Sequence, residues 1–126
     1  MNRHNLTVVT LVFTLVLAGT AFGGMRVNAP VVIDDVTTKS FWGSFAGARN
    51  SANGTEFISC IDVRTVGQCV ARDASGLTKS CVTTDPVHLE LIRSLSDASW
   101  VRVGYAVDGT CTSITRAISS LYGPMK

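Results

Sequence analysis

Histidine, the commonest general base of enzymes, is scarce in this sequence. There are only two histidines, and one of them, His4, lies in an N-terminal segment that we expect to be removed. The other, His88, is expected on the solvent-facing side of a short helix. A serine hydrolase needs a positioned serine, histidine and acid, but no G-x-S-x-G motif and no glycine-rich phosphate-binding loop are present. The sequence favours a non-catalytic protein and leaves a small secreted hydrolase with an unrecognised site as the alternative.

Clustered charge and metal-binding patterns are also missing. Charged residues make up 16% of the chain and the arginines are scattered along it, whereas nucleic-acid binding usually needs a basic face. The four cysteines are 9, 12 and 30 positions apart, unlike the closely spaced cysteine pairs of zinc sites. The adjacent acids Asp34 and Asp35 would point to opposite faces of an extended chain, so they do not form a glycosidase pair. No cofactor, metal or nucleic-acid partner is expected.

The N-terminus has the organisation of a secretory signal peptide. Arg3 gives it a basic start, residues 6–17 are uncharged and mainly apolar, and the residues that follow are mostly small. Twelve helical residues span about 18 Å, too short for a hydrocarbon core of about 30 Å. We expect cleavage after Gly23 or two residues earlier, with an uncleaved anchor over residues 6–22 as the alternative. A signal peptide over residues 1–23 predicts export to the periplasm or the medium, without stable membrane insertion.

An even number of cysteines in an exported chain indicates disulfide bonds. Between Cys69 and Cys81, a three-residue hairpin loop can end at Gly76, because glycine readily adopts the positive φ that this position requires. Counting outward from the loop places Cys69 directly opposite Cys81, near the distance that a disulfide needs. We therefore predict the bond Cys69–Cys81 and, by elimination, the bond Cys60–Cys111.

Alternating strands and tight turns account for most of the remaining chain. Residues 24–38 are predicted to be an extended N-terminal arm with a short edge strand at residues 31–33. Residues 39–126 are predicted to be a single β-rich domain, in which residues 39–49 form a strand. Because tight hairpins join antiparallel strands, the predicted fold is a small α+β domain: a mostly antiparallel sheet, stabilised by disulfides, with one short helix on one face.

The predicted helix begins after Asp85, a good N-cap, with Pro86 at the first helical position. Val87, Leu91 and Leu95 recur at i, i+4 and i+8, with Ile92 beside them, so we expect this stripe to pack on the sheet.

A closing hairpin is predicted around Gly109. Residues 99–107 and 110–118 flank a two-residue turn signal, and the first of them alternates with period two. The turn places Val103 opposite Ile114 and Tyr105 opposite Thr112.

Aromatic residues supply the one candidate binding surface. Phe41, Trp42 and Trp100 are expected on the sheet face opposite the helix, where flat rings could bind sugar rings or a protein partner. The alternative is that these rings complete the core of a small domain.

Several segments resemble a group of small exported proteins of Gram-negative bacteria that have no established function. The resemblance covers roughly residues 40–120 and implies a bacterial exported domain without assigning an activity. Together with the scarcity of catalytic groups, it leads us to expect a binding module for a protein, a peptide, a glycan or another cell-envelope component. The segments that carry it are residues 48–52, 69–81, 99–105 and 108–114.

Overall fold

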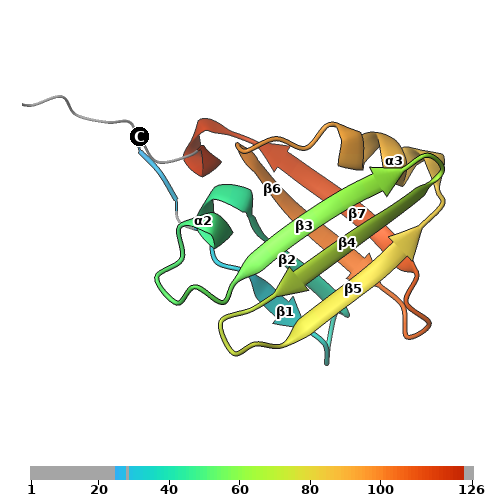
Figure 1. The fold of residues 1–126 in the computed structure, drawn as a ribbon, viewed down its shortest axis with the longest axis horizontal. Coiled ribbons are helices and arrows are strands. Elements are labelled where there is room, and N and C mark those ends of the chain that lie inside the picture. The colour runs from blue at the N-terminus through green and yellow to red at the C-terminus, as the bar shows by residue number, and fades with distance from the viewer. Residues whose placement is uncertain (1–24, 28, 124–126) are drawn as a thin grey trace, which may run out of the picture.

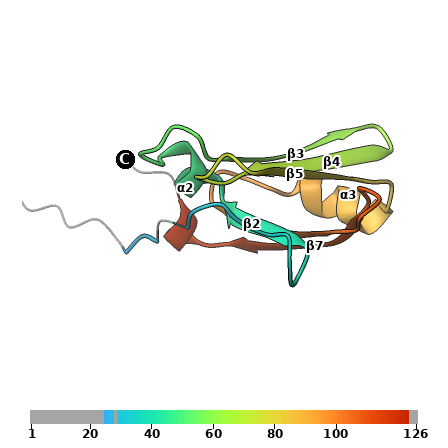
Figure 2. The same cartoon turned by 90° about the horizontal axis from the view of Figure 1, so that it is seen from below.

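The computed structural model describes residues 25–27 and 29–123, and in this part of the chain seven strands form two antiparallel sheets. The sheets lie one above the other as two layers (Figures 1 and 2). The signal peptide predicted at residues 1–23 lies outside the described residues.

The four-stranded sheet has the order β1-β2-β6-β7, and the three-stranded sheet has the order β3-β4-β5. The strands of the first sheet are β1 (Val32–Asp34), β2 (Ser40–Ser44), β6 (Ser99–Tyr105) and β7 (Cys111–Ile118). Those of the second are β3 (Phe57–Val63), β4 (Val66–Arg72) and β5 (Thr78–Thr83). The helical segments are α2 (Phe45–Arg49), α3 (Pro86–Arg93) and a 3₁₀ helix, η1 (Ser120–Tyr122).

The core lies between the two sheets. Phe41, Val101 and Val103 point inward from the four-stranded sheet and are completely buried, as are Cys69 and Ala71 of the three-stranded sheet. Burial of each large apolar side chain contributes roughly 1.5–3 kcal/mol. Since consecutive residues of a strand face opposite sides, the neighbours of these core residues lie on the outer faces. The predicted fold class, a disulfide-stabilised α+β domain with mostly antiparallel strands, is confirmed, with the strands divided between two sheets.

Helix α3 begins as predicted, and most of its predicted stripe packs inward: Ile92 is buried, and Leu91 and Leu95 are partly buried against the core. The Asp85 side chain accepts a hydrogen bond from the Val87 amide at 2.8 Å, and Pro86 occupies the first turn. However, the helix lies between the two layers (Figure 2), and its buried residues are Leu89 and Ile92. Val87, at the start of the predicted stripe, is 65% exposed.

Gly67 of β4 explains this orientation of the helix. A Cβ atom at this position would lie 2.8 Å from Ile92 Cδ1 and 2.9 Å from Leu89 Cδ2. The absence of a side chain therefore lets the helix approach the β3–β4 hairpin closely, with Leu89 and Ile92 toward it.

In the N-terminal part of the domain, the predicted edge strand is present, but the strand predicted after it is shorter than expected. The short edge strand expected at residues 31–33 is present as β1, one residue later. The strand expected over residues 39–49 ends at Ser44, whose hydroxyl accepts a hydrogen bond from the Gly47 amide at 2.9 Å and caps α2. A serine that can cap competes effectively with strand continuation, because it satisfies an amide that would otherwise lack a partner.

The predicted disulfide pairing is wrong, although the register behind it is right. Cys69 is directly opposite Cys81, and Gly76 has a φ of 89°. However, Cys69 lies on the central strand β4, so it is also directly opposite Cys60 on β3. The bonds are Cys60–Cys69, with Cα atoms 4.1 Å apart, and Cys81–Cys111, with Cα atoms 5.0 Å apart.

The position of Cys111 explains this choice of partners. It begins β7 directly after a turn that contacts β5, where the Val82 amide donates to the Gly109 carbonyl at 2.8 Å. Cys111 therefore lies beside Cys81, whereas Cys60 belongs to the opposite edge strand of the three-stranded sheet. The bond Cys81–Cys111 consequently joins the two sheets.

A second link between the sheets is centred on Asp35, in the turn between β1 and β2. Its carboxylate accepts a hydrogen bond from the Tyr105 hydroxyl at 2.6 Å and forms ion pairs with Lys79 at 2.9 Å and Lys39 at 3.8 Å. The Tyr105 hydrogen bond is the main reason why the pKa of Asp35 is lowered. Burial, followed by the hydrogen bond to Asp35, raises the pKa of Tyr105 well above its usual range. Lys79 lies on β5, so this cluster also connects the two layers.

Peptide mapping without reduction tests the disulfide assignment. Trypsin acting on the denatured, alkylated protein should release residues 50–64 joined to residues 65–72, and residues 80–93 joined to residues 103–116. A mass that joins residues 65–72 to residues 80–93 would contradict the assignment.

The Asp35 link predicts a pH dependence with a definite sign. A carboxylate with a lowered pKa stabilises the fold above its ordinary value of 3.8, and this contribution is lost as the pH falls through the lower, folded value. Carboxyl-carbon NMR titration should show the pKa of Asp35 below 3.8 in the wild type and closer to that value in Tyr105→Phe. The same titration midpoint in both proteins would show that Tyr105 does not hold the carboxylate.

Candidate functional site

The outer face of the four-stranded sheet carries both tryptophans of the chain. Trp42 on β2 is directly opposite Arg102 on β6, and Trp100 lies two residues before Arg102 on the same strand. All three alternate with completely buried core residues, so they point away from the three-stranded sheet. The side chains of this outer face, called the tryptophan face below, are Val32, Trp42, Trp100, Arg102, Thr115 and Ala117.

A cation–π contact organises the centre of this face. The Arg102 guanidinium carbon lies 4.9 Å from the centroid of the Trp42 ring. Such a contact is worth about 0.5–1 kcal/mol at an exposed site. Trp42 and Trp100 are only partly buried and Arg102 is exposed, so the cluster is accessible to a ligand from solvent.

A chain of hydrogen bonds fixes the other side of the guanidinium. Arg102 Nη2 donates to Ser40 Oγ at 3.3 Å, Ser40 Oγ lies 2.7 Å from Thr38 Oγ1, and Thr38 Oγ1 donates to Asp34 Oδ2 at 2.8 Å. Because the only hydroxyl proton of Thr38 is given to Asp34, the proton between Thr38 and Ser40 must come from Ser40. Every donor in the chain therefore points toward the Asp34 carboxylate.

Asp34, the last residue of β1, is itself held firmly by the turn that follows it. Its carboxylate accepts the backbone amides of Val36, Thr37 and Thr38. These hydrogen bonds, with that of Thr37 first, lower the pKa of Asp34. The carboxylate therefore stays ionised and fixes the far end of the chain that positions Arg102. The adjacent Asp35 serves the inter-sheet link instead, so the two acids act on different parts of the structure.

The arrangement can recognise an anion next to an apolar surface. A guanidinium has five donors in a planar fork that matches a carboxylate or phosphate, and Ser40 uses one nitrogen of Arg102. The remaining donors can meet an anion, while the Trp100 ring beside them offers an apolar surface. Small residues on the neighbouring strand, Thr115 and Ala117, leave these groups unobstructed on that side.

The structure brings together two of the three residues predicted for the binding surface. Trp42 and Trp100 share the outer face, but Phe41 does not. Phe41 is completely buried and its ring stacks on Tyr105, with centroids 5.9 Å apart. Because consecutive residues of a strand face opposite sides, the sequence alone already indicates that Phe41 and Trp42 point in opposite directions. Arg102 was missed because its meeting with Trp42 depends on the pairing of β2 with β6, which are about sixty positions apart.

His88 has a structural role at the start of α3. Its Nδ1 lies 2.9 Å from Thr83 Oγ1, and the Asp85 amide donates to the same hydroxyl oxygen at 3.2 Å. Thr83 is only 3% exposed, so its hydroxyl is not accessible as a nucleophile. The contact therefore ties β5 to α3.

The outer face of the three-stranded sheet provides a useful comparison. Arg72 lies over the ring of Phe57 at 5.3 Å and donates from Nε to Thr78 Oγ1 at 3.0 Å. This stack resembles that of Arg102, but exposed aliphatic residues such as Ile61 and Val63 share its face, and there is no second aromatic ring.

Within residues 25–27 and 29–123, no helix has both the length and the apolar character needed to cross a membrane. In the same ranges, no three histidine, cysteine or acidic side chains are grouped as a metal site. The chain matches no protein-family model, no curated protein and no solved structure. Its resemblance to small exported bacterial proteins stays a prediction.

Fluorescence quenching tests the charge at the tryptophan face. Both tryptophans of the chain lie beside Arg102, so the ratio of iodide to caesium quenching should exceed the ratio measured for free N-acetyltryptophanamide. Arg102→Ala should lower the iodide quenching constant by up to about twofold, because the local attraction for anions is lost. Arg72→Ala, on the other sheet, should leave it unchanged. A wild-type ratio at or below that of the free amide would contradict this placement.

Proposed function

We propose that this is an exported, non-catalytic protein that binds acidic saccharides of the cell envelope or its surroundings through the tryptophan face. The observation that carries this proposal is the placement of Arg102. Its guanidinium is held over Trp42 and hydrogen-bonded through Ser40, with Trp100 beside it.

Sugar acids fit the chemistry of this face. A uronic acid presents a carboxylate, which suits the free donors of Arg102, and an apolar face of C–H groups, which suits an indole ring. The face is a sheet surface and not a deep pocket, so it favours a polymer that lies across several strands. The tryptophan face has only one arginine, Arg102, whereas nucleic-acid binding depends on several basic contacts. The face is therefore poorly suited to nucleic acid.

Export is the second element of the proposal. The two disulfides are typical of an oxidising compartment. The apolar and small-residue pattern of residues 1–23 supports a signal peptide. We propose the periplasm or the external medium as the place of action.

Calorimetry with polygalacturonate, an acidic polysaccharide, and dextran, a neutral one, tests this function. The protein should bind polygalacturonate more tightly than dextran, and added salt should weaken the binding. Arg102→Ala and Trp42→Ala should each weaken it roughly tenfold, since a hydrogen bond to a charged group or a ring contact is worth about 1–3 kcal/mol.

Matched controls lie on the other sheet. Arg72→Ala and Phe57→Ala remove the corresponding stack from the three-stranded sheet and should not alter binding. Binding of neither polysaccharide, or equal losses in the two pairs of variants, would overturn the proposal. In the first case, the tryptophan face would be assigned to a protein partner.

A further inference from the structure

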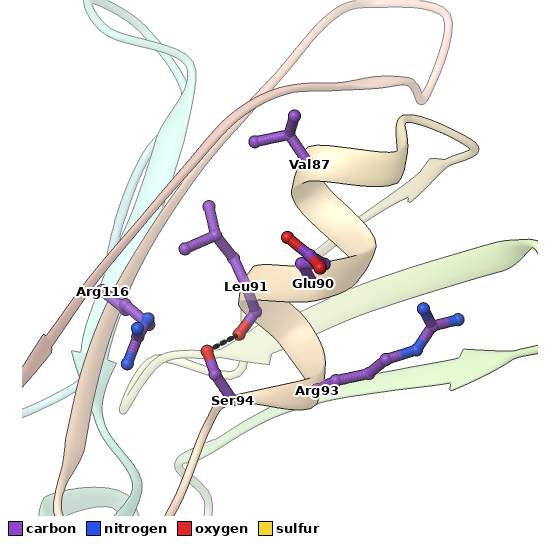
Figure 3. Close-up of a pocket in the computed structure, with 6 residues that line it drawn as sticks. All are labelled: Val87, Glu90, Leu91, Arg93, Ser94 and Arg116. Atoms are coloured by element: carbon purple, nitrogen blue, oxygen red, sulfur yellow. Dashed lines mark hydrogen bonds between the residues drawn. The ribbon is translucent and has the colours of Figure 1, made fainter.

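A crevice runs between α3 and the edge strand β7 and has a volume of about 530 Å³ (Figure 3). It lies on the inner side of the four-stranded sheet, away from the tryptophan face, because Arg116 is opposite the core residue Val101. Its lining residues are Val87, Glu90, Leu91, Arg93, Ser94 and Arg116.

One wall of the crevice is apolar. Val87 is 65% exposed and Leu91 is partly buried. They are one helical turn apart and belong to the stripe that the sequence pattern assigned to the core. Leu91 already packs partly against the core, whereas Val87 does not, so Val87 and the exposed part of Leu91 form this wall.

The other wall is a strand with an open edge. β7 is the outermost strand on its side of the four-stranded sheet. Beyond its start, where Thr110 bridges to Val82, no other described strand pairs with its free edge. It contains no proline. An open edge presents alternate backbone N–H and C=O groups to which an extended peptide can hydrogen-bond.

Arg116 supplies the charge in this crevice. No hydrogen bond or ion pair joins its side chain to the described residues, and Figure 3 shows it on β7, across the crevice from α3. The neighbouring Arg93 is different, because it pairs with Asp62 at 2.7 Å and donates to the Arg64 carbonyl at 2.7 Å. Arg116 is therefore the cation that remains for a ligand. Glu90, also without an ion pair among the described residues, disfavours a ligand with a run of acids.

We propose that an extended segment of a partner protein adds to the free edge of β7 and places alternate side chains in the crevice. An acidic side chain pairs with Arg116, and an apolar side chain packs on Val87 and Leu91. A second copy of this chain is the rival occupant, and the oligomeric state measured below distinguishes it. The crevice lies on the side of the sheet opposite the tryptophan face, so the two proposed sites use different side chains.

Selection from a displayed library of random heptapeptides tests the proposal. The protein should enrich peptides that have apolar residues at alternate positions and one acidic residue. A synthetic copy of the enriched peptide should lose about tenfold or more in affinity with Arg116→Ala, the cost of removing a charged hydrogen bond. Its binding should protect backbone amides of β7 from hydrogen exchange.

Two further variants separate a local effect from a general one. Arg72→Ala changes the net charge by the same amount as Arg116→Ala, but on the outer face of the three-stranded sheet, and should leave peptide affinity unchanged. Arg116→Glu should shift the selection to basic peptides, a result that a merely destabilised protein would not give.

The proposal would be overturned if no sequence is enriched, or if Arg116→Ala binds the enriched peptide as tightly as the wild type. It would equally be overturned if the peptide perturbs the tryptophan face instead, or if the protein elutes as a dimer that Arg116→Glu alters. Polysaccharide binding measured in parallel distinguishes these failures from failure of the saccharide site.

Discussion

The bond between Cys81 and Cys111 is the constraint on which the arrangement of the two sheets depends. It joins β5 of one layer to β7 of the other. On the chain-entropy account, its loop of thirty positions contributes about 4 kcal/mol, against about 3 kcal/mol for the shorter Cys60–Cys69 loop. For a domain of this size, such a contribution is a large part of the net stability. The Asp35 link joins the same layers by charge and hydrogen bonds.

Both proposed sites depend on that cross-link for their geometry. β7 is a wall of the crevice beside α3, and its Thr115 and Ala117 border the tryptophan face. A strand fixed at its first residue to the opposite layer can present one face to solvent and one to the helix without shifting. The result is a small scaffold whose exposed groups, such as Arg102, are positioned by the fold before any ligand arrives. Preorganisation of this kind reduces the entropy lost on binding.

The sequence predicted local structure better than long-range structure. The hairpin loop that ends at Gly76 and the start of α3 after Asp85 follow from residues within a few positions of each other. Both are confirmed. The closing hairpin also has the predicted pairing of Val103 with Ile114. However, a bulge between Gly104 and Tyr105 shifts the register, so Tyr105 lies opposite Cys111 and not Thr112 as predicted. These features depend on turn and cap chemistry, which the sequence states directly.

The features that were missed depend on which segments meet in space. The disulfide prediction considered one neighbour of Cys69, whereas a central strand has two. The buried side of α3 is set by the approach that Gly67 permits, not by the helix pattern alone. The central pair of the tryptophan face, Trp42 and Arg102, arises from the pairing of two distant strands. In each case the deciding contact lies far away along the chain.

Comparison of two double variants by amide NMR tests the central role of the inter-sheet bond most directly. Loss of Cys81–Cys111, through serine at both positions, should shift amide resonances in both sheets, including those of Phe41 and Ala71 in the core. Loss of Cys60–Cys69 should shift mainly β3 and β4. If the spectrum of the first variant differs from the wild type only around β5 and β7, the bond does not hold the two layers in place.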